Sequence, residues 1–135
     1  MISFMISRLS IGALLVGGFA LLFGADTILP RLAPGVPSSA GWLGQLVAAA
    51  WIGVAVMNWM QRTSVLGGIY GRPVVSANLV LYFVSTLSLV RARMHDVIPA
   101  MAWVVIVPLA LLAAAYGALL LRGPFDRLGP VVPPR

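Results

Sequence analysis

Four long apolar blocks make up most of this chain, and clusters of Pro, Gly and Arg separate them. Each block approaches the roughly 20 residues that a helix rising about 1.5 Å per residue needs to cross the hydrocarbon of a bilayer. Four such spans leave almost no chain for a domain outside the membrane. The pattern predicts an all-α integral membrane four-helix bundle, a single transmembrane domain over residues 1–135 with spans at 9–29, 42–60, 73–90 and 98–121 and a Pro-rich tail at 122–135.

The first apolar run also has features of a signal peptide, because a short head with one arginine precedes it. At about 20 residues it is longer than the roughly 7–15 of a signal core, and no A-x-A cleavage site follows, so we expect a retained helix. Small residues at spacings of 4, 3 and 4 share one narrow face of this helix, where another helix can approach closely. They are Ala13, Gly17, Ala20 and Gly24.

Prolines punctuate the chain in three places. The stretch PRLAPGVPSSAG at 30–41 predicts a loop, since its prolines remove amide donors and break helices. Pro73 suits the first turn of the third span. Pro108 lies inside the fourth span, where it should remove a hydrogen bond and kink the helix.

The second and fourth spans each carry a close-packing face. One sector of the second span holds small residues together with an indole, an amide and a guanidinium, and we expect it to face protein because an amide facing lipid would lack a partner. Its members are Gly44, Ala48, Trp51, Ala55, Asn58 and Arg62. The fourth span repeats the pattern with Trp103, Ala110, Ala114 and Gly117.

Composition places the chain among membrane proteins, with 61% hydrophobic and 9% charged residues and a mean hydropathy of +1.03. The net charge of +6 comes entirely from arginines at predicted helix ends, so it indicates membrane topology and no nucleic-acid partner. Arg usage without any Lys indicates a bacterial origin, and therefore a multi-pass protein of the cell inner membrane with the lipid bilayer as its surroundings.

Arginines are distributed unevenly between the two sides of the predicted bundle. Six fall on the side of the termini and three on the other, which predicts that both termini are cytoplasmic. The six are Arg8, Arg62, Arg72, Arg122, Arg127 and Arg135, and the three are Arg31, Arg91 and Arg93.

The turn between the second and third spans, NWMQRTSVLGGIYGRPVVSAN, holds the main candidate site. Asn58 and Asn78 come to similar depth if the two spans form a hairpin. Their amides either bond to each other and join the helices, or line a polar pocket together with Tyr82 and Ser85 on the next turns of the third span. Joining the helices is the favoured interpretation.

The glycine-rich part of the same turn is a candidate binding site for an anionic group. Gly67, Gly68 and Gly71 surround Tyr70, and Arg62 and Arg72 flank them. Exposed amides beside a helix N-terminus favour a phosphate, a lipid headgroup or a carboxylate. The alternative is a tight turn whose arginines follow membrane topology, and this alternative is preferred.

Residues for catalysis or metal binding are scarce. The chain has no cysteine, no glutamate, one histidine (His95) and three aspartates, so neither a usual zinc site nor a nucleophile with its base can be assembled. We expect Asp26, at the end of the first span, to pair with an arginine. The chain also lacks the first-span glutamate of small four-helix multidrug exporters. No enzyme, no metal and no cofactor are predicted.

The span number, the Pro-rich first loop and the NW…R…GGIYGRP…N hairpin resemble the layout of the DoxX family of four-span bacterial membrane proteins, over the whole chain. No functional motif matches residue by residue, so no functional residue is carried over. The leading hypothesis is a non-enzymatic structural or accessory subunit of a membrane complex, or a self-associating bundle. The alternative is a small transporter, a channel or an anionic-lipid-binding module that uses the 58–78 hairpin.

Overall fold

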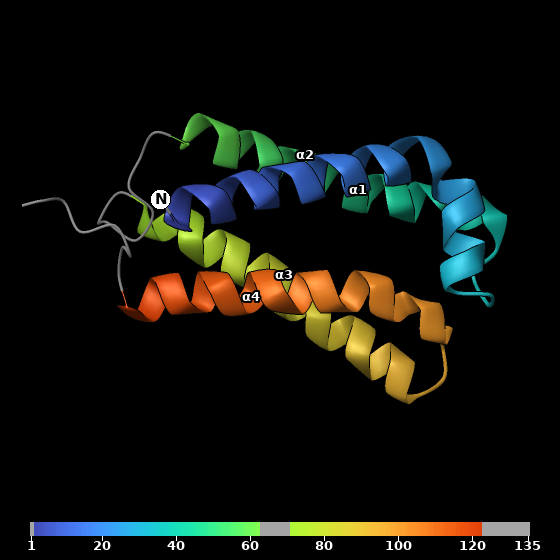
Figure 1. Ribbon diagram of the computed structural model, residues 1–135. Helices are drawn as coiled ribbons and strands as arrows, with labels where there is room; N and C mark the ends of the chain where they lie inside the picture. The colour runs from blue at the N-terminus through green and yellow to red at the C-terminus, as the bar shows by residue number, and fades with distance from the viewer. Residues whose placement is uncertain (1, 63–70, 123–135) are drawn as a thin grey trace, which may run out of the picture.

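The computed structural model describes residues 2–62 and 71–122, and these fold into four long helices joined as antiparallel neighbours (Figure 1). Each of the four is long and apolar enough to cross a membrane, which confirms the predicted all-α four-helix fold. The helices are α1 (Ile2–Leu32), α2 (Gly41–Met60), α3 (Arg72–Met94) and α4 (Trp103–Arg122), with the 3₁₀ helices η1 (Ser38–Ala40) before α2 and η2 (Ala100–Ala102) before α4.

The ends of α3 follow from its local sequence. Pro73 lies in the first turn, where its missing amide hydrogen costs no helical bond. The helix continues past the predicted end at Val90 to Met94, because Arg91 and Arg93 lie in the last turn and favour its negative end.

The first helix is longer than its predicted span, and its last turns bend away from the axis of the rest (Figure 1). No helix breaker precedes Leu9, so α1 already begins at Ile2. Pro30 does not end the helix as expected. It lies in the last turn, where it removes only the bond to the Asp26 carbonyl, and α1 bends and continues to Leu32.

Two helical hairpins make up the molecule, because α1 packs mainly on α2 and α3 mainly on α4, with few contacts between the pairs. The α1–α2 seam requires small residues. A methyl group on Gly44 would come within 2.9 Å of the Ala25 side chain, and one on Gly18 within 2.8 Å of Ile52. Gly18 and Ala25 therefore belong to this seam, although they lie outside the small-residue face predicted for the first span.

Contacts between the hairpins concentrate at two levels. The main core joins all four helices near the end where α1 begins and α4 ends; it consists of Leu14, Ala55, Val74, Val75, Tyr82, Leu109, Ala113, Tyr116 and Leu119. A smaller cluster of Ile98, Ala102 and Ile106 lies at the opposite end. Ala33, which directly follows the bent end of α1, packs against this smaller cluster.

Candidate functional site

A buried polar cluster joins three helices near the end of the molecule where α1 begins. It consists of Ser10 on α1, Asn58 on α2, and Asn78 and Tyr82 on α3, each of them 0–1% exposed. Three of its four members, Asn58, Asn78 and Tyr82, are residues of the predicted site. Ser10 was not predicted, because a single serine in an apolar span is common. Only its position close to the charged Arg8 indicates that it lies near one end of the first span.

The two asparagine amides face each other and exchange hydrogen bonds in both directions. Asn58 Nδ2 donates to Asn78 Oδ1 at 2.8 Å, and Asn78 Nδ2 donates to Asn58 Oδ1 at 2.6 Å. Asn78 Nδ2 also donates to the Val74 carbonyl one turn earlier on α3, at 2.9 Å. This reciprocal pair fixes the depth at which α2 and α3 meet.

Ser10 connects the first helix to this pair. Its hydroxyl donates to Asn78 Oδ1 at 3.3 Å and accepts from Asn58 Nδ2 at 3.2 Å. Because its single hydrogen is then used, the 2.5 Å contact with Tyr82 is one in which the tyrosine hydroxyl donates to Ser10. Every amide and hydroxyl hydrogen of the four residues is therefore bonded within the protein, so the amides join the helices as preferred from the sequence.

One polar group beside the cluster lacks a partner. The Tyr116 ring on α4 lies against the Tyr82 ring with centroids 5.8 Å apart and an interplanar angle of 26°. Its hydroxyl is buried and has no hydrogen-bond partner among residues 2–62 and 71–122. The contact of α4 with the cluster is therefore made by ring packing.

The remaining predicted site residues lie apart from the polar cluster. The Arg62 guanidinium lies over the Trp59 ring, 4.4 Å from its centroid, and donates to the Trp59 carbonyl at 2.9 Å, so it covers the negative end of its own helix. Arg72 is exposed at the start of α3. Tyr70 and residues 63–69 of the predicted anion site lie outside the described residues, and an anionic ligand there stays a prediction.

Two cavities lie between the hairpins, on the far side of the core from the chain ends. One of about 390 Å³ is lined by all four helices, and the other of about 440 Å³ is lined by α1, α4 and Trp51. They have five lining residues in common, so they are two halves of one space, called here the inter-hairpin cleft. The common residues are Leu21, Leu32, Trp51, Val105 and Leu109.

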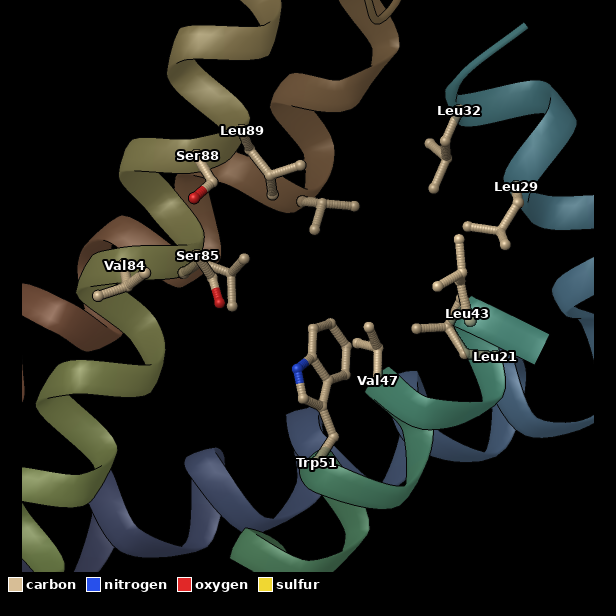
Figure 2. A pocket seen from close by; sticks show the side chains of 13 residues that line it. Leu21, Leu29, Leu32, Leu43, Val47, Trp51, Val84, Ser85, Ser88 and Leu89 are labelled. Carbon is tan, nitrogen blue, oxygen red and sulfur yellow. The ribbon is translucent and has the colours of Figure 1, made fainter. Parts of the chain in front are cut away.

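Ser85, the last predicted site residue, lies in this cleft, one turn beyond Tyr82. Figure 2 shows the Ser85 hydroxyl and the indole nitrogen of Trp51 facing the space between the hairpins, with leucines and valines around them. The Trp51 ring packs directly on Gly17 of α1, which provides the protein neighbour that a tryptophan in mid-span needs. Gly17, Ala13 and Ala20 line the cleft, so most of the predicted small-residue face of the first span borders a cavity.

A groove on the outside of the α3–α4 hairpin contains the small residues predicted as a seam on the fourth span. Its volume is about 400 Å³, and Ala110, Ala114 and Gly117 line it with Leu79 and Phe83 of α3. A methyl group on Gly117 would lie 3.7 Å from Leu79, an ordinary contact distance. Packing within the described chain therefore does not require the glycine.

Two of the three aspartates, Asp26 and Asp96, lie within the described residues. Arg93 forms an ion pair with Asp96, whose backbone has a positive φ of 54° just after α3. The side chain of Asp26 contacts Gly41 at the start of α2, and no ion pair of Asp26 with an arginine is found among the described residues. No group of three His, Cys, Asp or Glu residues close enough to hold a metal ion occurs within the described ranges.

The four apolar spans and the apolar cleft together define a multi-pass membrane protein. Comparison with known proteins found no matching family model, no similar curated protein and no similar solved structure. The resemblance in layout to the DoxX family stays a prediction.

Proposed function

We propose that this multi-pass membrane protein is a non-enzymatic binding protein that takes up a hydrocarbon guest from the bilayer into its inter-hairpin cleft. The lining of the cleft carries the proposal. Apart from a few polar atoms it is apolar, with leucine, valine, alanine and tryptophan side chains prominent. Each half falls within the range of about 300–1,000 Å³ typical of ligand pockets.

The position of the cleft supports access from the side. The main core lies at one end of the bundle, and the contact of Ala33 with the smaller cluster of Ile98, Ala102 and Ile106 lies at the other. Between them the cleft lies within the span, next to lipid on the α2–α3 side and on the α1–α4 side. The acyl chains of the surrounding lipids are therefore the guests present at the highest local concentration.

The non-enzymatic part of the proposal is supported by where the reactive residues lie. His95 and Asp96 directly follow α3, Asp26 lies beside the start of α2, and the chain has no cysteine or glutamate. The cleft itself offers hydroxyl and indole groups, which hold a ligand in place more readily than they catalyse a reaction.

Native mass spectrometry of the purified protein tests this function. We expect a lipid to stay bound after detergent exchange, and a Val105→Trp substitution, which fills the centre of the cleft, to release it. Val80→Trp is the matched control, because Val80 is 60% exposed and lines none of these cavities. Equal lipid retention in the two variants would refute the proposal.

A second candidate is the accessory or self-associating role, and the α3–α4 groove favours it. Small residues that face outward on a membrane helix are typical of helix–helix interfaces, because they let backbones approach. Since the chain has no cysteine, Ala114→Cys tests a homodimer directly. A disulfide-linked dimer would support self-association, and a monomer with unchanged partners in a mild-detergent pull-down would count against this role.

The proposed location is a bacterial inner membrane with both termini in the cytoplasm. Arg8, Arg62 and Arg72 all lie at the same end of the bundle, which supports this orientation. A thiol introduced by Ser38→Cys, at the opposite end, should react with a membrane-impermeant reagent in intact cells, whereas one introduced by Arg62→Cys should not. The reverse labelling would overturn the orientation.

A further inference from the structure

Two polar groups of the inter-hairpin cleft, the Ser85 hydroxyl and the Trp51 indole N–H, lie at mid-membrane depth. A third, the Ser88 hydroxyl, lies one turn nearer the end of α3. Neither the Ser85 hydroxyl nor the Trp51 indole N–H has a hydrogen-bond partner among the described residues. The hydroxyls and amides of the nearby cluster of Ser10, Asn58, Asn78 and Tyr82 are, in contrast, all paired. Figure 2 shows the Ser85 and Trp51 groups directed toward the same space. In hydrocarbon, a polar group without a hydrogen-bond partner destabilises the protein, because no water is present to take the place of that partner.

The chemistry of the pair defines what it would bind. The indole N–H only donates, and the serine hydroxyl donates as well as accepts, so a ligand that meets both must offer an acceptor oxygen. Apart from the Ser88 hydroxyl, the rest of the lining is apolar, and charged side chains are absent from it. The acceptor must therefore be uncharged, and a carbonyl oxygen on a long hydrocarbon chain fits because its two lone pairs can accept from both donors while it brings no donor of its own.

The depth of the pair separates neutral lipids from phospholipids. Trp51 lies at the middle of α2 and Ser85 near the middle of α3. The charged headgroup of a phospholipid stays at the surface, roughly 15 Å from the midplane of a hydrocarbon core about 30 Å thick. The ester carbonyls attached to that headgroup do not reach Trp51, whereas a molecule without a charged headgroup enters the midplane freely.

We propose that the guest of the cleft is an uncharged lipid whose carbonyl oxygen accepts hydrogen bonds from Trp51 Nε1 and the Ser85 hydroxyl, with its chains along Leu21, Val105 and Leu109. This inference rests on the proposed function, because it requires that the cleft admits hydrocarbon. It adds a recognition element to that function. The same chemistry is available from an acylglycerol ester and from a long-chain ketone.

Photolabelling of the reconstituted protein tests the inference with three diazirine probes of equal chain length: a diacylglycerol, a long-chain ketone and a plain alkane. We expect both carbonyl probes to label the cleft more strongly than the alkane. Ser85→Ala and Trp51→Phe should each lower carbonyl-probe labelling about three- to tenfold, the range of one membrane hydrogen bond. Alkane labelling should stay unchanged in Ser85→Ala.

Matched controls are available on the same elements. Ser76→Ala changes a serine of α3 outside the cleft, and Trp103→Phe changes an exposed tryptophan, so neither should affect any probe. If only one carbonyl probe responds to Ser85→Ala, the inference holds and that probe identifies the source. Equal labelling by all three probes with no effect of Ser85→Ala would overturn carbonyl recognition and leave the hydrocarbon cleft standing. No labelling of cleft residues by any probe would overturn both.

Discussion

At the scale of single residues, every hydrogen-bond donor in the side chains of Ser10, Asn58, Asn78 and Tyr82 has a partner within the protein. Polar side chains in hydrocarbon need protein partners, and a typical bond between membrane helices contributes only about 0.6 kcal/mol on average. The larger effect comes from losing one partner, because the other then stays buried and unpaired. The cluster therefore specifies the register of three helices more than it adds to their total stability.

A double-mutant cycle on the amide pair tests this interpretation. Asn58→Ala and Asn78→Ala should each lower the free energy of unfolding by about 1–3 kcal/mol, because each leaves the opposite amide unpaired. The double variant should lose less than the sum, by about 0.6–1.7 kcal/mol. Unfolding in SDS followed by circular dichroism measures all three. Gln45→Ala, at an exposed site on α2, serves as control, and strict additivity of the pair would contradict the account.

The two stacked tyrosines provide a second test at this scale. Tyr82→Phe should cost about 1 kcal/mol, since it removes the bond to Ser10. Tyr116→Phe should cost nothing or stabilise the protein, because it removes a buried hydroxyl without a partner among the described residues. The same SDS unfolding assay compares the two. A loss for Tyr116→Phe as large as that for Tyr82→Phe would show that the Tyr116 hydroxyl is bonded.

The sequence predicts part of this site and cannot predict the rest. Asn58 and Asn78 are identifiable because amides within apolar spans are rare and a hairpin brings equal depths together. Ser10 is not identifiable in this way. It lies at the very start of the predicted first span, and only the extension of α1 back to Ile2 places it inside the bundle. The side chain of Ser85 lies one turn beyond Tyr82 yet faces the cleft, and only the splay of the hairpins decides this.

At the scale of helices, hydropathy locates all four elements, but packing decides their faces. The small residues of α1 are spread over two adjoining faces. The one with Gly18 meets α2 closely, and the one with Gly17 accommodates the Trp51 ring beside the cleft. The spacing of the small residues in the sequence does not distinguish between these two faces. The bend at Pro30 is also a packing result, because the sequence permits a helix end or a kink at that proline.

Glycine substitutions distinguish these faces experimentally. A methyl group at Gly17 would come within 2.8 Å of Trp51 Cε3, so Gly17→Ala must displace the indole and should cost about 1–3 kcal/mol. Gly53→Ala, also within a helix, meets nothing within 4 Å and should be neutral or stabilise by up to about 1 kcal/mol. SDS unfolding measures stability, and Trp fluorescence reports the displaced ring. Equal effects of the two substitutions would contradict the assigned contact.

At the scale of the whole molecule, the fold consists of two hairpins that touch at their ends and separate between them. The polar cluster and the main core join the hairpins near the chain ends, and the bent end of α1 brings Ala33 to the start of α4. The inter-hairpin cleft lies between these two contacts, within the four apolar spans. We propose that hydrocarbon from the bilayer occupies this space.

Quenching of Trp51 fluorescence by brominated lipid chains tests that claim most directly. A single-tryptophan variant is made by changing Trp42, Trp59 and Trp103 to Phe, and it is reconstituted with phospholipids brominated near the chain ends or near the glycerol. A second variant that keeps only Trp103, which is 47% exposed, is the positive control. If chains enter the cleft, Trp51 is quenched as strongly as Trp103 and most strongly by bromines near the chain ends. If Trp51 stays unquenched while Trp103 is quenched, the cleft is closed to the bilayer and the account is wrong.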